Sequence, residues 1–153
     1  MAGDGYPFKT FNFSVEINRG EDGHPLANAA FAEVDGLEMS QEIKTIREGG
    51  SNDRQIRLNG PAVLGTLTLK RGMTEGFDLW KWFQDSVADP RLRASAEVVL
   101  LAPDGSTERA RFLLSRCVPV KLKAPALNAK DGQVAIEELQ VAYESLSLRR
   151  TGA

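Results

Sequence analysis

The stretch from Phe31 to Phe83 constrains the fold more than any other part of this chain. Two segments of alternating apolar and polar residues, each typical of a strand, flank a polar arm, Arg47–Pro61, and a helical pattern follows. The arm is longer than an ordinary hairpin loop, and its weakly alternating middle, Arg54–Leu58, would allow it to pair as a strand. Since a compact domain seldom carries such a loop unless the loop binds something, we expect the arm to contact other copies of the same chain.

Alternation predicts strands along most of the chain. They are expected at Phe11–Ile17, Phe31–Val34, Leu37–Ile46, Gly65–Arg71, Ala94–Leu101, Ala110–Val118, beyond Pro119 and at Gln133–Leu148. Asn18–Asn28 and Ala124–Gly132 are expected to be loops, and Pro103–Ser106 a hairpin turn. Ile46 interrupts its alternation, so we expect a bulge or a change of environment there. The apolar phase shifts near Glu137-Glu138, so we expect a bulge in the final strand. Pro119 predicts a sheet edge or a bend.

One helix is expected at about residues 75–87. Thr74 is the candidate N-cap, and Pro90 ends the helical pattern. Apolar residues spaced three to four apart predict the buried stripe: Phe77, Trp80, Phe83 and Val87. Trp82 lies off this stripe, so we expect it to cover a strand edge or to contact a neighbouring subunit.

These elements predict a mainly β protein, an antiparallel β-barrel or sandwich with one packed α-helix. At 153 residues, the chain is expected to form a single domain over residues 1–153. Its net charge of −2 creates no field that favours nucleic acid or an anionic membrane. Without an N-terminal signal pattern or an apolar run of about 20 residues, we expect synthesis and assembly in the cytoplasm and no membrane insertion.

No catalytic residue, cofactor or metal site is expected. Cys117 and His24 are the one cysteine and the one histidine, too few for a structural zinc site. His24 lies in a polar loop without an orienting partner, and Cys117 is expected to be a half-buried thiol on the face of Leu113 and Ser115. Adjacent strand residues point to opposite faces, so the Glu137-Glu138 pair cannot act as acid and base together.

The glycines at Gly49 and Gly50 lack the context of a phosphate-binding loop. Basic residues are concentrated at Arg47, Arg54, Arg57, Lys70 and Arg71, near two tryptophans. This concentration leaves open a second class of function, a monomeric small β-barrel that binds an oligonucleotide or a glycan.

The segments FAEVDGLEM, IKTIREGG and GTLTLKRGMTEGFDLWKWF resemble the phage tail-tube-like proteins of contractile injection systems. That group shares its fold with the haemolysin-coregulated tube protein of type VI secretion. The resemblance continues, in order, through FNFSVEI, VVLLAPD, PVKLKAPAL and VAIEELQVAYESLSL, and so covers nearly the whole chain. The Asn18–Asn28 loop is somewhat extended relative to the family pattern.

The resemblance implies a structural subunit rather than an enzyme. Six subunits would form a ring around an inner β-barrel, and rings would stack into a tube inside a contractile sheath. The implied partners are the sheath protein, baseplate and spike proteins, and cargo in the lumen. A close alternative is the tube-initiating ring that links the spike to the tube.

By the same resemblance, the arm should reach a neighbouring subunit or the next ring. The residues expected to make this contact are Arg47, Glu48, Gly49, Gly50, Ser51, Asn52, Asp53, Arg54, Gln55, Ile56 and Arg57. A strand between the core and a wet lumen should carry polar residues outward. The candidates for the lumen face are Glu42, Lys44, Thr66, Thr68, Lys70 and Gln140. The alternative is that some of these residues face the sheath.

Overall fold

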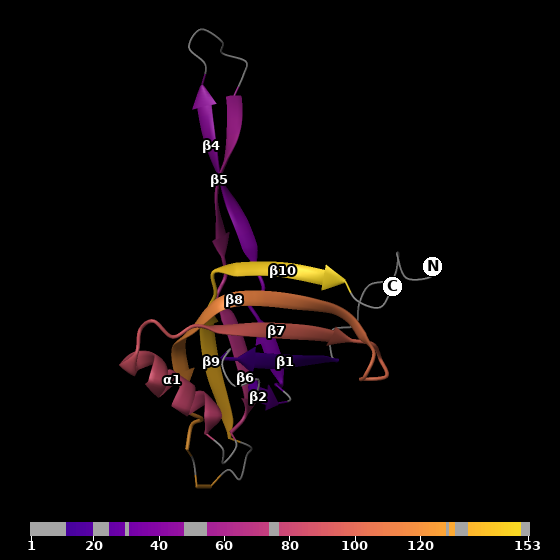
Figure 1. Cartoon of the computed structure of the whole chain (residues 1–153), viewed down its shortest axis with the longest axis vertical. Coiled ribbons are helices and arrows are strands. Elements are labelled where there is room, and N and C mark those ends of the chain that lie inside the picture. The colour runs from indigo at the N-terminus through magenta and orange to yellow at the C-terminus, as the bar shows by residue number, and fades with distance from the viewer. Residues whose placement is uncertain are drawn as a thin grey trace.

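The computed structural model describes residues 12–19, 25–29, 31–47, 55–73, 77–127, 129–130 and 135–150. Within them, a curved antiparallel β-sheet with one packed helix forms a body, and a long two-stranded hairpin projects from it (Figure 1). This confirms the predicted mainly β fold. The elements are β1 Phe13–Asn18, β2 Pro25–Ala29, β3 Glu33–Asp35, β4 Met39–Arg47, β5 Gln55–Leu64, β6 Leu67–Gly72, α1 Asp78–Ala88, β7 Ala94–Leu101, β8 Glu108–Lys123, β9 Ile136–Ala142 and β10 Ser145–Arg150.

The strand β8 connects the parts of the body sheet, whose strand order is β2-β1-β7-β8-β9-β6-β3. The first part of β8 pairs with β7 and β10, and its last part pairs with β9. Two bulges bend it, one where Arg116 has φ 51° and one at Pro119–Lys121. The bend predicted from Pro119 is therefore confirmed, and it lets one strand serve two differently oriented parts of the sheet.

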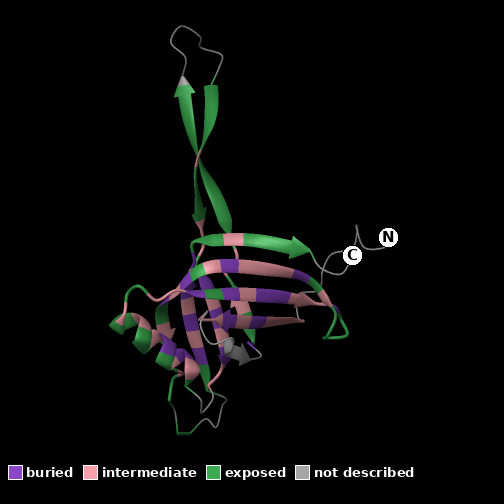
Figure 2. Cartoon of the chain, viewed as in Figure 1, coloured by how far each residue is buried: buried purple, intermediate pink, exposed green. Residues whose placement is uncertain are grey.

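The core follows the alternation of the strands, and buried positions recur at every second residue along them (Figure 2). The side chains that are almost completely buried include Val15, Ile17, Leu67, Leu69, Val98, Leu139 and Val141. These residues come from four strands, β1, β6, β7 and β9, and they occupy positions that the alternation predicted to face inward. Leu67 and Leu69 face the core, as expected.

Three predictions about the strands were wrong. The strand β2 begins inside the expected loop Asn18–Asn28, continues to Ala29 and pairs with β1. The final strand is regular at Glu137 and Glu138, and it breaks instead at Tyr143-Glu144, between β9 and β10. The third error concerns Cys117, which shares its buried face with Leu114 because the bulge at Arg116 shifts the phase of β8.

The thiol of Cys117 is completely buried rather than half-buried. Burial raises its pKa to about 11, although the backbone hydrogen bond with Ala96 opposes that shift. At neutral pH the group therefore stays a thiol, which is a poor nucleophile.

The helix α1 buries a different face from the one predicted. Leu79 and Trp82 are its buried residues, whereas Phe77 is 48% and Val87 69% exposed. Trp80 and Phe83 are half-buried. The helix begins only at Asp78, after Phe77 in a left-handed conformation, and packs against β8 and β2. Thr74, the predicted N-cap, lies outside the described residues.

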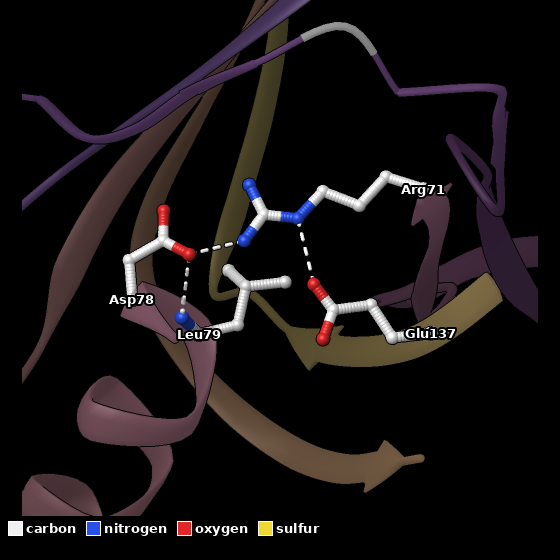
Figure 3. A network of polar contacts seen from close by, with 4 residues as sticks. All are labelled: Arg71, Asp78, Leu79 and Glu137. Carbon is white, nitrogen blue, oxygen red and sulfur yellow. Dashed lines mark hydrogen bonds and ion pairs between the residues drawn. The ribbon is translucent and has the colours of Figure 1, made fainter. Parts of the chain in front are cut away.

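A buried ion network fixes the start of α1 (Figure 3). The Nε of Arg71 on β6 donates to Oε1 of Glu137 on β9 at 2.8 Å, and its Nη2 donates to Oδ1 of Asp78. The same Asp78 oxygen accepts the backbone N–H of Leu79 at 3.0 Å. Arg71 also lies over the ring of Phe31, 5.3 Å from its centroid. The network joins two strands to the helix and so places Leu79 and Trp82 toward the core.

The charges of this network are costly to bury. The side chains of Arg71 and Glu137 are each 3% exposed. Burial by itself lowers the pKa of Arg71, but the hydrogen bonds to Asp78 and Glu137 outweigh it and raise that pKa overall. A buried charge without a partner is strongly destabilising, so the loss of any one of these charged side chains would destabilise the fold through the partners that remain.

Replacement of Trp82 by Ala should lower the free energy of unfolding by about 3–5 kcal/mol, since it removes a large buried side chain and leaves a cavity. Val87→Ala is the matched control on the same helix, and it should change stability by no more than about 0.5 kcal/mol. Urea denaturation of unassembled subunits measures both. Equal losses would contradict the observed face of α1.

Replacement of Arg71 by Met should lower the free energy of unfolding by about 3–5 kcal/mol, because it leaves the buried carboxylate of Glu137 without its cation. The double variant Arg71→Met, Glu137→Leu should recover most of that loss, because it removes both buried charges. The same denaturation series measures it. If the double variant is no more stable than Arg71→Met, the loss of stability in Arg71→Met does not come from the unpaired charge of Glu137.

Candidate assembly interface

The most exposed part of the described chain is the hairpin of β4 and β5, which contains the predicted arm Arg47–Pro61 and extends beyond it at both ends. From here on, the arm means this whole hairpin, Met39–Leu64. Its strands pair with each other and form a separate two-stranded sheet (Figure 1). The arm residues whose burial the structure describes are exposed except Gly60 and Leu64, which are intermediate (Figure 2). An isolated two-stranded hairpin is at best marginally stable in water. The arm is therefore a structure that contact with another molecule would stabilise.

The arm is longer and more regular than the sequence predicted. Arg47 and Gln55–Pro61, expected within a loop, belong to paired strands. The alternation at the centre of the predicted arm reflects pairing with β4. Residues 48–54, which include most of the expected contact residues, lie outside the described residues.

The bulge predicted at Ile46 was also wrong. Ile46 pairs regularly with Ile56, and the irregularity lies where Gln41 and Ile43 pair with Ala62 and Asn59. There the arm places the backbone of Gly60 against that of Glu42, since a Cβ on Gly60 would lie 2.7 Å from the Glu42 carbonyl oxygen. A glycine at this position therefore lets the two strands approach closely.

Large apolar side chains occupy both faces of the arm. The cross-strand register places Met39, Ile43 and Leu64 on one face and Ile46, Ile56, Leu58 and Val63 on the other. Six of the seven are between 38% and 56% exposed. Both outer edges also carry backbone groups that no strand of the described chain pairs. Exposed apolar faces together with open edges are typical of a protein–protein contact surface.

A second, polar surface lies on the body. Thr68 and Lys70 on β6 pair with Gln140 and Glu138 on β9, so the structure brings three expected lumen residues onto one sheet face. Lys121 and Lys123 of β8 pair with the same β9 residues and extend this surface. The Nζ of Lys70 lies 3.2 Å from Oε2 of Glu33. The hydrogen bond and charge of Glu33 raise the pKa of this exposed Lys70 amine.

A cavity of about 230 Å³ opens at one end of this polar surface. Its lining contains Lys70, Glu138, Ile136 and the segment 123–126. The other expected lumen residues lie elsewhere. Glu42 and Lys44 are on the arm, and Thr66 lies between β5 and β6.

The structure does not gather the predicted basic residues into one surface. Arg71 is buried in the ion network, Lys70 is paired with Glu33, and Arg57 is on the exposed arm. The side chain of Arg47, together with Arg54 and His24, lies outside the described part. Among the described residues, no three His, Cys, Asp or Glu side chains are grouped as a metal site would require. No helix in the described ranges is long and apolar enough to cross a membrane.

Two features were not predicted from the sequence, one in the arm and one in the body. The predicted arm ended at Pro61, whereas β5 continues to Leu64 and so adds the exposed apolar residue Val63 to the arm. The buried role of Glu137 was not predicted either. Its spacing matches that of Leu139 and Val141, but its charge indicated an outward position.

Comparison with known proteins identifies the type of chain. The family model described as "T4-like virus tail tube protein gp19" matches residues 9–147, which is most of the chain. A comparison with curated protein sequences found no significant match.

Solved structures share the fold over almost the whole length of the chain. A chain of the anti-feeding prophage baseplate, six-fold symmetrised, is 26% identical with a TM-score of 0.82, and the match covers 95% of this chain and 97% of that one. A chain of the PVC extracellular contractile injection system, in its extended sheath–tube complex, is 20% identical with a TM-score of 0.81, and the match covers 97% and 95%. Hcp1 from Flavobacterium johnsoniae is 13% identical with a TM-score of 0.54 over 92% and 97%.

Proposed function

The chain belongs to the family of T4-like virus tail tube proteins, and from this premise we propose that it forms six-membered rings that stack into the inner tube of a contractile injection particle. A tail tube protein is a structural subunit rather than an enzyme. The observation that carries the proposal is the arm, which presents apolar residues on two faces and has two open edges. Closed assemblies of identical subunits commonly cover such surfaces by pairing copies.

We propose that the arm binds a neighbouring subunit or the next ring. Its apolar residues supply the contact area, and its unpaired strand edges supply backbone hydrogen-bonding groups. The described members of the expected contact set, Arg47 and Gln55–Arg57, lie at the outer end of this hairpin. The larger arm adds Met39, Ile43 and Leu58 to that surface.

The proposed partners follow from the related particles. One similar chain lies in a sheath–tube complex and another in a baseplate. We propose that the outer wall of the tube contacts a contractile sheath and that its first ring meets baseplate or spike proteins. Cargo would pass through the lumen.

A specific observation keeps the tube-initiating ring as a second candidate. The chain that is 26% identical belongs to a baseplate structure, where a tube begins, whereas the chain from the sheath–tube complex is 20% identical. A main tube subunit needs two compatible ring faces, whereas an initiator needs one such face. Electron microscopy of the purified chain separates the two, because the main tube subunit forms stacked tubes and the initiator forms single rings.

Shortening the arm should abolish stacking or ring closure without unfolding the body. Replacement of residues 44–58 by Asn-Gly retains the Ile43–Asn59 pair and supplies a two-residue turn. We expect the melting temperature to stay within about 3 °C, because the arm packs little against the core, and we expect long tubes to be lost. Electron microscopy and sedimentation measure assembly.

The control for that variant is Val87→Ser, which removes an exposed apolar side chain from α1 and should leave stacking intact. Long tubes formed by the shortened subunit would show that the arm has been assigned the wrong role. If the chain stays monomeric at every concentration and binds an oligonucleotide or a glycan more weakly as salt increases, the result would instead support a monomeric β-barrel that binds such a ligand.

We propose further that the polar surface of Thr68, Lys70 and Gln140 lines the lumen. The strand pairing places these three residues on one face, opposite the core. Glu42, Lys44 and Thr66 remain candidates for the lumen face. Glu42 and Lys44 lie on the arm and Thr66 lies at its base, so these residues contact the lumen only if the arm does. The alternative is that this face meets the sheath.

Cysteine labelling tests the lumen position. Because Cys117 is completely buried, a cysteine introduced at Lys70 is the reactive thiol among the described residues. In assembled tubes, Lys70→Cys should react with a small maleimide but only a small fraction should react with a maleimide attached to a protein too large for the channel. Val87→Cys, on the exposed side of α1, is the control and should react with both. Full reaction of Lys70→Cys with the large reagent would place this face outside.

A further inference from the structure

The arm continues the strand pairing of the body through a short joint. The last pair of the β3–β6 ladder is Asp35–Thr68, and the first pair of the arm is Met39–Leu64. Residues 36–38 on one strand and 65–67 on the other lie between these pairs, and we call these six residues the arm joint. The direction of the whole arm depends on the conformation of the joint.

The backbones of the joint are in very close contact. Gly36 has φ +93°, and a Cβ there would lie 1.9 Å from the Thr66 carbonyl oxygen. A Cβ on Gly65 would lie 2.9 Å from the Gly36 carbonyl oxygen. The Gly65 N–H donates to the Glu38 carbonyl at 2.9 Å and ties the two strands together. Glycine is needed at Gly36 both for space and for its positive φ.

One side chain of the core holds this joint. Tyr143 follows β9, its ring belongs to the core, and only 6% of the residue is exposed. Its hydroxyl donates to the Gly36 carbonyl at 2.8 Å and accepts the Glu38 N–H at 3.3 Å. The Glu38 carbonyl lies 3.2 Å from the same hydroxyl. A single phenol therefore contacts the entering strand of the arm at two residues.

The ion network is not part of this connection. The joint lies at the arm end of β6, at Leu67, whereas Arg71 lies at the opposite end of that strand. Asp35 adds a local bond, since its Oδ1 accepts the Gly36 N–H at 2.8 Å. Among the described residues, the side-chain hydrogen bonds that connect the core to the joint come from Tyr143.

We propose that Tyr143 is a positioning residue for assembly, whose hydroxyl fixes the direction of the arm before the arm meets another subunit. The inference rests on the proposed role of the arm in assembly. If the arm already has its bound direction, less conformational entropy is lost when subunits associate, and tubes therefore form at a lower subunit concentration. The hydroxyl acts through the backbone of Gly36 and Glu38, because the arm itself extends away from the core.

The variant Tyr143→Phe tests this role, because it retains the buried ring and removes only the hydroxyl. Hydrogen exchange is measured on subunits below the assembly concentration. We expect amides of residues 39–47 and 55–64 to exchange about tenfold faster, the effect of losing roughly one hydrogen bond, while β7 and β8 amides keep their rates. The subunit concentration needed for tube formation should rise by about tenfold or more.

Thr107→Ala is the matched control, since it removes one hydroxyl hydrogen bond, to Asp104 at 2.6 Å, in the turn before β8. It should leave both arm exchange and assembly at wild-type values. Faster exchange throughout the body in Tyr143→Phe would mean a general structural role and overturn the proposal. Unchanged arm exchange, or a loosened arm with wild-type assembly, would overturn it as well.

These outcomes are distinct from failure of the proposed function. If the arm does not take part in assembly, the shortened subunit still forms tubes. If the arm does take part but Tyr143 does not position it, the shortened subunit fails to form tubes while Tyr143→Phe assembles normally.

Discussion

The arrangement of the body depends on the ion pairs that the buried guanidinium of Arg71 forms with Glu137 and Asp78. This guanidinium joins β6 to β9 through Glu137 and to the first turn of α1 through Asp78. A charge in this position is tolerated only because both carboxylates and the ring of Phe31 surround it. The helix starts at Asp78, the residue that contacts Arg71, and from that start Leu79 and Trp82 lie on its buried face while Val87 remains exposed.

Much of the fold was predictable because alternation in a strand is a local property. Leu67, Leu69, Leu139 and Val141 could be placed in the core from their spacing alone. Glu137 could not, because a charged residue reads as outward until its partner is known, and that partner is 66 residues away. The face of α1 was misjudged for the same reason. Leu79 and Trp82 also fit a helical spacing, so periodicity alone could not decide between their face and that of Phe77, Trp80, Phe83 and Val87.

The interface was predictable only in outline. Length and composition marked an arm, and the resemblance assigned it to assembly, but the register that divides its apolar residues between two faces depends on an irregularity near Gly60. That irregularity has no local sequence signal beyond a glycine followed by a proline. The polar surface was foreseen in part, since Thr68, Lys70 and Gln140 come together by pairing, whereas Glu42 and Lys44 follow the arm away from the body.

The way β8 is shared has a consequence for the order in which the chain can fold. Its two halves pair with strands before and after it, and β1 pairs with β7 at residues as distant as Phe13 and Leu100. Such separations make folding slow, because distant segments must meet before their contacts contribute any stability. During synthesis the arm emerges before β7 to β10, so its apolar faces are available while the body is incomplete. Apolar surface that is exposed at this stage favours aggregation of the incomplete chain.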